Sequence, residues 1–120
     1  EYAQRPYDRD ILVGVLVPKE NARFVYQSVR NSQTDFPVLT CAAAKLADGS
    51  IRAAIGARPG KAVLYTAAPE AGETTEEFAA RFAAEVKAGI KTESNLRGGA
   101  EYRRHLAGVL TKRAVCRLEG

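Results

Sequence analysis

Apolar positions follow two different periods along the chain, and the first half has the period of strands. Short apolar runs occupy residues 11–17, 37–47, 51–57 and 61–66, and the first of them is interpreted as a buried strand that Pro18 ends. The period of residues 22–29 fits a strand and a helix equally well, and a strand is preferred. Asp48 and Gly49 form a dipeptide that suits a two-residue turn with both residues at positive φ, so residues 37–57 predict a hairpin.

From residue 74 onward the apolar period is helical. Thr74 and Glu77 have the spacing of a capping box, and apolar residues then recur every four positions to about Lys91. A second helix is predicted from the apolar stripe Tyr102, Leu106, Val109, Leu110 and Ala114. Strands followed by helices predict an α+β fold, an antiparallel sheet of three to four strands with helices packed on one face.

Composition places the chain among ordinary globular proteins. Its 120 residues suit one domain, with 46% hydrophobic and 27% charged residues. No apolar run approaches the ~18 residues of a membrane span and no signal peptide is visible, so we expect a cytoplasmic protein with no membrane partner. The chain opens on Glu1 and contains no methionine, which suggests a piece cut from a longer polypeptide.

Charge and cysteine content favour no particular chemistry. Eighteen Lys and Arg against 14 Asp and Glu leave a net charge of +4, which favours polyanionic partners only mildly. Cys41 and Cys116 lack metal-binding spacing and are interpreted as buried thiols. His105 is the single histidine, so a histidine-based metal cluster cannot form, and we expect neither a metal site nor catalytic residues in this chain.

Gly98 and Gly99 precede a cationic run that continues into the second predicted helix. Glycines ahead of a helix can present backbone N–H groups to a phosphate, but the spacing of a phosphate loop is missing, so an elbow between two packed helices is preferred. The cations of this helix could contact RNA or an acidic protein, which leaves a stand-alone binding module as the alternative function. No recognition motif accompanies them, so a solvated face is preferred and nucleic acid is not expected.

Two stretches resemble a known family: "VRNSQTDFPVLTCAAAKLADGSIRAAIGARP" and "SNLRGGAEYRRHLAGVLTKRAV". They are similar to the C-terminal domain of the FAD-binding subunit of molybdenum hydroxylases, the group that contains carbon monoxide dehydrogenase and xanthine dehydrogenase. The family's Arg-Gly-Ser-Ala-Glu-Tyr-Arg type motif opens the last helix, and here it begins at Arg97 with Gly99 in place of the serine. The resemblance implies that residues 1–20 are the closing strand and linker of a preceding FAD-binding domain, and residues 21–120 the C-terminal α+β domain.

The resemblance also implies cofactors, partners and site residues. In such enzymes substrate is oxidised at a molybdenum cofactor, electrons cross 2Fe-2S clusters in partner subunits, and FAD passes them to an acceptor such as NAD. The C-terminal domain packs on the FAD domain and supplies a loop near the flavin, with most of the FAD site outside this chain. The expected cofactor-binding residues are Tyr26, Arg30, Asn31, Ser32 and Asp35. Expected at interfaces with neighbouring domains or subunits are Arg97, Tyr102, Arg103 and Arg104.

Overall fold

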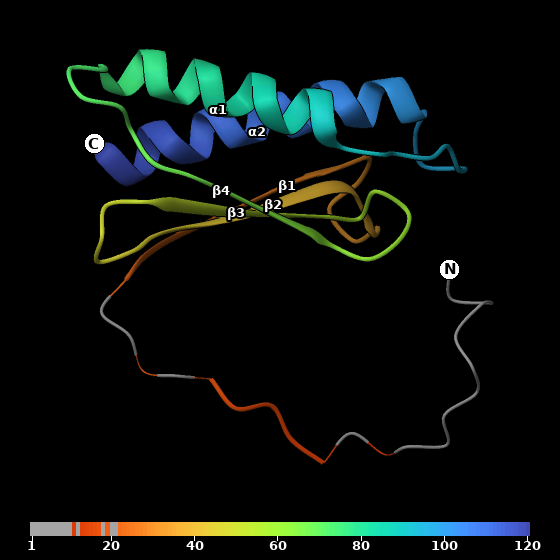
Figure 1. The fold of residues 1–120 in the computed structure, drawn as a ribbon. Helices are drawn as coiled ribbons and strands as arrows, with labels where there is room; N and C mark the ends of the chain where they lie inside the picture. The colour runs from red at the N-terminus through yellow and green to blue at the C-terminus, as the bar shows by residue number, and fades with distance from the viewer. Residues whose placement is uncertain (1–10, 12, 18, 20–21) are drawn as a thin grey trace.

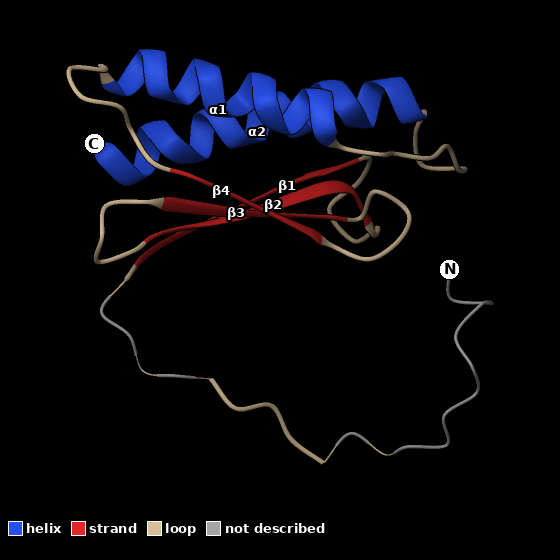
Figure 2. Cartoon of the chain, viewed as in Figure 1, coloured by secondary structure: helices blue, strands red, loops and turns tan. Residues whose placement is uncertain are grey.

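The computed structural model describes residues 11, 13–17, 19 and 22–120, and the helices and strands between residues 23 and 119 form a two-layer α+β domain (Figure 1). Strands β1 (Arg23–Arg30), β2 (Pro37–Lys45), β3 (Ile51–Gly56) and β4 (Val63–Ala67) make one antiparallel sheet in the order β1-β2-β3-β4. Helices α1 (Thr75–Gly89) and α2 (Ala100–Glu119) pack against each other on one face of this sheet (Figure 2). The predicted fold class is therefore confirmed.

The core fills the space between the helices and one face of the sheet. Alternate residues of β2 and β3 point into it, and α1 contributes Phe78 and Phe82, whose stacked rings lie 6.0 Å apart. Burying several large apolar side chains at about 1.5–3 kcal/mol each drives the two layers together. The fully buried apolar side chains of the core include Leu39, Cys41, Ile51, Ile55, Phe78, Phe82, Val86, Val115 and Leu118.

Helix α1 begins where its local sequence predicts. The Thr74 hydroxyl accepts a hydrogen bond from the Glu77 amide at 3.3 Å, and the Glu77 carboxylate accepts one from the Thr74 amide at 2.9 Å. This reciprocal pair satisfies two amides that have no partner within the helix. The predicted capping box is therefore confirmed, and the helix ends at Gly89, close to the expected Lys91.

The β2–β3 hairpin differs from the predicted turn. Only Gly49 has a positive φ (83°), and its amide donates to the Leu46 carbonyl at 3.0 Å while the Leu46 amide donates to the Ser50 carbonyl at 2.9 Å. The connection therefore has three residues, with a left-handed glycine after the turn, rather than two. The Asp48 carboxylate accepts hydrogen bonds from the Ser50 amide and hydroxyl at 2.9 and 2.6 Å, which favours the ordinary negative φ of Asp48.

The buried strand predicted at residues 11–17 does not form within this chain at the residues that the structure describes, and its assignment to a preceding domain stays a prediction. These residues have no strand conformation, and Ile11, Val13, Val15, Leu16 and Val17 are 73–99% exposed. An apolar run forms a buried strand only where another strand supplies hydrogen bonds and a covered face. The β1 strand, which begins at Arg23, pairs with β2 instead.

Candidate functional site

The loop between β1 and β2 is folded back on itself by its own polar groups. One guanidinium nitrogen of Arg30 donates to the Asp35 carbonyl at 2.5 Å, and the Asp35 amide donates to the Ser32 carbonyl at 3.2 Å. The Asp35 carboxylate accepts a hydrogen bond from the Phe36 amide at 2.7 Å. Small polar side chains thus replace the sheet ladder as partners for the loop backbone, as the sequence predicts.

A second loop, which connects α1 to α2, fastens the first one. Arg97 donates from Nε to the Asp35 carboxylate at 2.9 Å, and Asn31 donates from its amide to the Arg97 carbonyl at 3.0 Å. The Arg97 guanidinium also lies over the Phe36 ring, 5.0 Å from its centroid. Arg30, Asn31, Asp35, Phe36 and Arg97 are here called the loop cluster. It joins the two stretches that carry the family resemblance through residues that are 62 and 66 positions apart in the sequence.

Hydrogen bonding keeps the carboxylate of the loop cluster ionised. The hydrogen bond from Arg97, followed by that from the Phe36 amide, lowers the pKa of Asp35 below its usual value, and burial opposes this only in part. The Asp35–Arg97 ion pair is partly exposed, with 30% and 36% of the two side chains accessible. Asp35 therefore braces the loop as an anion, while Arg30 remains a positive charge at the end of β1.

Arg103 differs from its expected role at an interface. Only 1% of its surface is accessible, and its guanidinium donates hydrogen bonds within the chain. The acceptors are the Val38 carbonyl at 2.9 Å, the Glu93 and Gly98 carbonyls at 2.6 Å, and the Asn95 side-chain oxygen at 2.5 Å. Because every acceptor belongs to β2 or to the α1–α2 loop, Arg103 holds that loop against the sheet and presents no donor to a partner.

The two glycines of the motif form the elbow that leads into α2. The Asn95 amide and the Gly98 carbonyl are joined by a 3.1 Å hydrogen bond, and the Gly98 amide returns one to the Asn95 carbonyl at 3.2 Å. A β-carbon on Gly98 would lie 3.1 Å from a methyl group of Val38, a tight contact that favours a glycine here. The Ser94 hydroxyl accepts from the Ala100 amide at 2.9 Å and thereby satisfies the first amide of α2. Gly98 and Gly99 therefore lie in a tight connection between α1 and α2, as the preferred elbow interpretation states.

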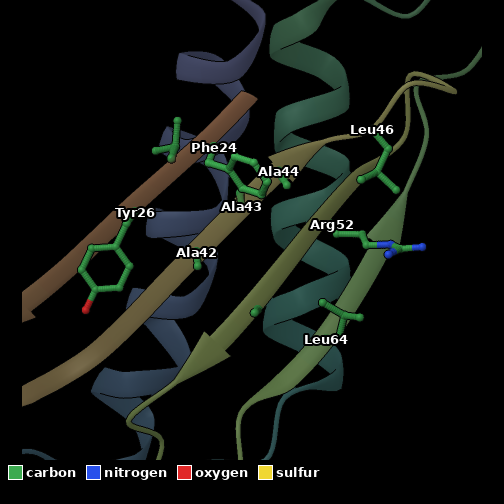
Figure 3. Close-up of a pocket in the computed structure, with 10 residues that line it drawn as sticks. Phe24, Tyr26, Ala42, Ala43, Ala44, Leu46, Arg52 and Leu64 are labelled. Carbon is green, nitrogen blue, oxygen red and sulfur yellow. The ribbon is translucent and has the colours of Figure 1, made fainter. Parts of the chain in front are cut away.

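The remaining predicted residues are exposed but lie apart. Tyr102 is 50% exposed on α2, which removes it from the predicted core stripe, and Arg104 beside it is exposed as well. Tyr26 is 60% exposed on the face of the sheet that the helices leave open (Figure 3). Ser32 is exposed at the tip of the β1–β2 loop. The structure thus brings Arg30, Asn31, Asp35 and Arg97 together and places the others on separate surfaces.

Two exposed apolar side chains beside the loops were not anticipated. Phe36 is 74% exposed although it follows a loop and precedes a buried strand, and Leu96 is fully exposed in the α1–α2 loop. A large apolar residue inside a polar loop is the sequence signal that could have drawn attention to both. They add an apolar surface next to the two arginines of the loop cluster.

Among residues 22–120 and the described part of the N-terminal segment, no three metal-binding side chains gather at one point. No helix in the part of the chain that the structure describes is long and apolar enough to cross a membrane. The fold and the loop cluster define a small two-layer domain with a cationic, partly aromatic loop at one end.

Comparison with known families agrees with this class. The family model for the CO dehydrogenase flavoprotein C-terminal domain matches residues 24–118, and the chain belongs to that family. The resemblance to the C-terminal domain of the FAD-binding subunit of molybdenum hydroxylases is thus confirmed. Comparison with curated protein sequences gives no significant match.

Solved structures share the fold at low sequence identity. Carbon monoxide dehydrogenase from Hydrogenophaga pseudoflava, in a form lacking the Mo-pyranopterin moiety, superposes with a TM-score of 0.72 at 23% identity over 88% of this chain. Quinoline 2-oxidoreductase from Pseudomonas putida 86 gives 0.69 at 19% identity over 85%. A cyanide-inactivated Cu,Mo-CO dehydrogenase gives 0.65 at 20% identity over 86%. The chain spans only 38–39% of each of these chains.

Proposed function

We propose that this domain completes the flavin site of its parent subunit and assists electron transfer through FAD to an acceptor such as NAD. In the parent complex the electrons come from a molybdenum cofactor through 2Fe-2S clusters on partner subunits, and the complex operates in the cytoplasm. Family membership supports the flavoprotein assignment. The single observation that carries the role of this domain is the loop cluster, in which Arg30 is held in place at an exposed end of the sheet.

The residues of the loop cluster fit a flat, electron-accepting ring. Asn31 and Ser32 offer exposed polar groups, and the Phe36 ring offers an exposed aromatic surface. FAD supplies reversible acceptance of electrons, and its reduced ring carries negative charge. Arg30 would place a positive charge beside that ring, because its guanidinium is anchored to the Asp35 carbonyl and forms no ion pair with a carboxylate of the described residues. The Asp35 carboxylate is paired with Arg97 and also attracts Arg30, so it offsets only part of the Arg30 charge.

The proposed role predicts a lower flavin reduction potential when Arg30 is replaced. A charge at the protein surface near the ring contributes about 0.5–1.4 kcal/mol, which corresponds to about 10–30 mV for a two-electron couple. We therefore expect Arg30→Ala in the full-length parent to lower the potential by that amount, measured by reductive titration against a reference dye. Arg23→Ala, at the opposite end of β1, is the matched control and should leave the potential unchanged. Equal potentials in the two variants would remove Arg30 from the flavin site.

The alternative function, a stand-alone binding module for RNA or an acidic protein, is supported by the exposed face of α2. Arg104, Lys112, Arg113 and Arg117 are all exposed there, although Arg103 is withdrawn into the interior. Counterion release would make any binding of RNA or an acidic protein through these groups fall steeply with salt. We expect the chain to pass through a nucleic-acid column at moderate salt, and salt-sensitive retention would favour the alternative.

A further inference from the structure

The face of the sheet opposite the helices, here called the open face, carries three large apolar side chains that are exposed to solvent. Phe24 and Tyr26 stand on β1 and are 71% and 60% exposed, and Leu64 stands on β4 and is 60% exposed. Between them the floor is made of alanines, which leaves a trough of about 490 Å³ (Figure 3). Contiguous apolar surface of this kind is uncommon on an isolated domain and marks a place where something else packs.

The register of the sheet makes this trough continuous across all four strands. Tyr26 is paired with Ala42, Ala42 with Ala54, and Ala54 with Leu64, so these four side chains lie in one row on the same face. Phe24 and Ala44 begin a parallel row, which continues to Arg52. Neighbouring strands are about 4.8 Å apart, so a row that crosses all four strands is about 14 Å long. The trough is therefore long enough to contact the surface of another folded domain.

The charges on this face indicate which kind of partner surface can pack against it. The four strands contain no Asp or Glu, whereas Arg30 and Arg52 belong to the open face. Arg52 forms no ion pair within 4.0 Å among the described residues, and the carboxylate nearest to it in the hairpin is that of Asp48, whose pKa Arg52 helps to lower. Two copies packed through this face would bring like charges together, which is unfavourable. A partner with an apolar patch and a carboxylate opposite Arg52 is favoured instead.

The chain ahead of β1 restricts where a preceding domain can lie. Val17 is joined to Arg23 by six peptide steps, which span at most about 3.3–3.6 Å each, or about 20–22 Å. Any body that includes residues 11–17 must therefore lie next to the start of β1, the strand that carries Phe24 and Tyr26. Since α1 and α2 occupy the other face, the open face is the nearest broad apolar surface available to it.

We propose that the open face of the sheet is the surface on which the preceding, flavin-binding domain of the parent chain docks. The inference rests on the proposed function for the existence of that domain and adds the contact surface. Phe24, Tyr26 and Leu64 insert into an apolar patch of that domain, and Arg52 meets a carboxylate at its margin. The exposed apolar residues at 11–17 belong to the same contact region, because they connect the preceding domain to this one.

Tyrosine nitration with tetranitromethane tests the proposal, because exposed tyrosines lie on both sides of the molecule. Tyr26 is on the open face, and Tyr102, which is 50% exposed on α2, is the internal control. In the 120-residue chain, whose core is complete within residues 23–120, both should react. In the full-length parent, with or without FAD, we expect nitration of Tyr26 to be about tenfold slower and that of Tyr102 to be unchanged.

Two variants of the full-length parent sharpen the test. Ala42→Glu places a charge at the centre of the trough and should restore nitration of Tyr26, while Ala84→Glu on the exposed side of α1 should not. Equal Tyr26 rates in the parent and the chain would overturn the proposal, and so would protection that appears only when FAD is added. Protection that grows with the concentration of the 120-residue chain would assign the face to a second copy.

The outcome for docking can be separated from the outcome for the proposed function. A parent that retains flavin while Tyr26 reacts freely would overturn the docking surface alone. A parent that retains no flavin would overturn the proposed function, whatever the rate at which Tyr26 reacts.

Discussion

Replacing Arg103 by alanine should destabilise the domain more than any other single change of a charged residue in α2. The guanidinium is 1% exposed and donates four hydrogen bonds of 2.5–2.9 Å, three of them to backbone carbonyls. Each buried acceptor left without a partner costs about 1–3 kcal/mol. The sum is an upper bound, because water can reach the acceptors in the α1–α2 loop once the side chain is gone. We therefore expect a loss of about 3–5 kcal/mol of the free energy of unfolding.

The neighbouring arginine supplies the control for this measurement. Arg104 is exposed on the same helix and forms no hydrogen bond or ion pair with the described residues, so Arg104→Ala should change stability by less than about 0.5 kcal/mol. Urea unfolding followed by far-ultraviolet circular dichroism gives both values. A loss of under about 1 kcal/mol for Arg103→Ala would refute the reasoning, because the buried Val38 carbonyl would lose its donor and the interior would lose a large, fully buried side chain.

Two further predictions concern titratable groups. The lowered pKa of Asp35 means that its bond to Arg97 stabilises the fold above the ordinary carboxyl pKa and is lost as the pH falls through the depressed value. The Asp35→Asn variant should therefore have a lower free energy of unfolding than the unmodified 120-residue chain at pH 7. This difference should shrink at pH 3, and a difference that stays constant with pH would contradict the ion pair. Burial raises the pKa of the Cys41 thiol to about 11, whereas Cys116 is partly exposed. A thiol reagent at pH 8 should modify Cys116 in the folded chain and Cys41 only in denaturant, and equal rates would show that the core is open.

The parts of the fold that depend on neighbouring residues could be predicted from the sequence. The capping box at Thr74 and the four-residue apolar spacing of α1 act within one or two turns, so both appear where the sequence places them. The strand that was preferred at residues 22–29, whose period fits a helix equally well, is β1, and its aromatic and β-branched residues suit a half-covered strand. The hairpin was found but its turn was not, since Asp48 satisfies the Ser50 amide and hydroxyl from a negative φ.

The parts that depend on distant residues could not be predicted. Arg103 has the sequence environment of a surface residue, and its burial follows from the Val38 carbonyl 65 positions away and from a loop that closes around it. The run at residues 11–17 has the composition of a buried strand, but the described chain offers it no partner strand. The loop cluster was half predicted: the resemblance named Arg30, Asn31 and Asp35, but only the structure joins them to Arg97.

The most direct test of the central proposal is the visible absorption spectrum of the full-length parent, loaded with FAD and then desalted. We expect flavin bands to be retained by the parent and to be nearly absent from the 120-residue chain treated in the same way, because we place most of the FAD site outside this domain. A folded but colourless parent would contradict the flavoprotein role. Tight, stoichiometric binding of FAD by the 120-residue chain alone would contradict the division of the site between two domains.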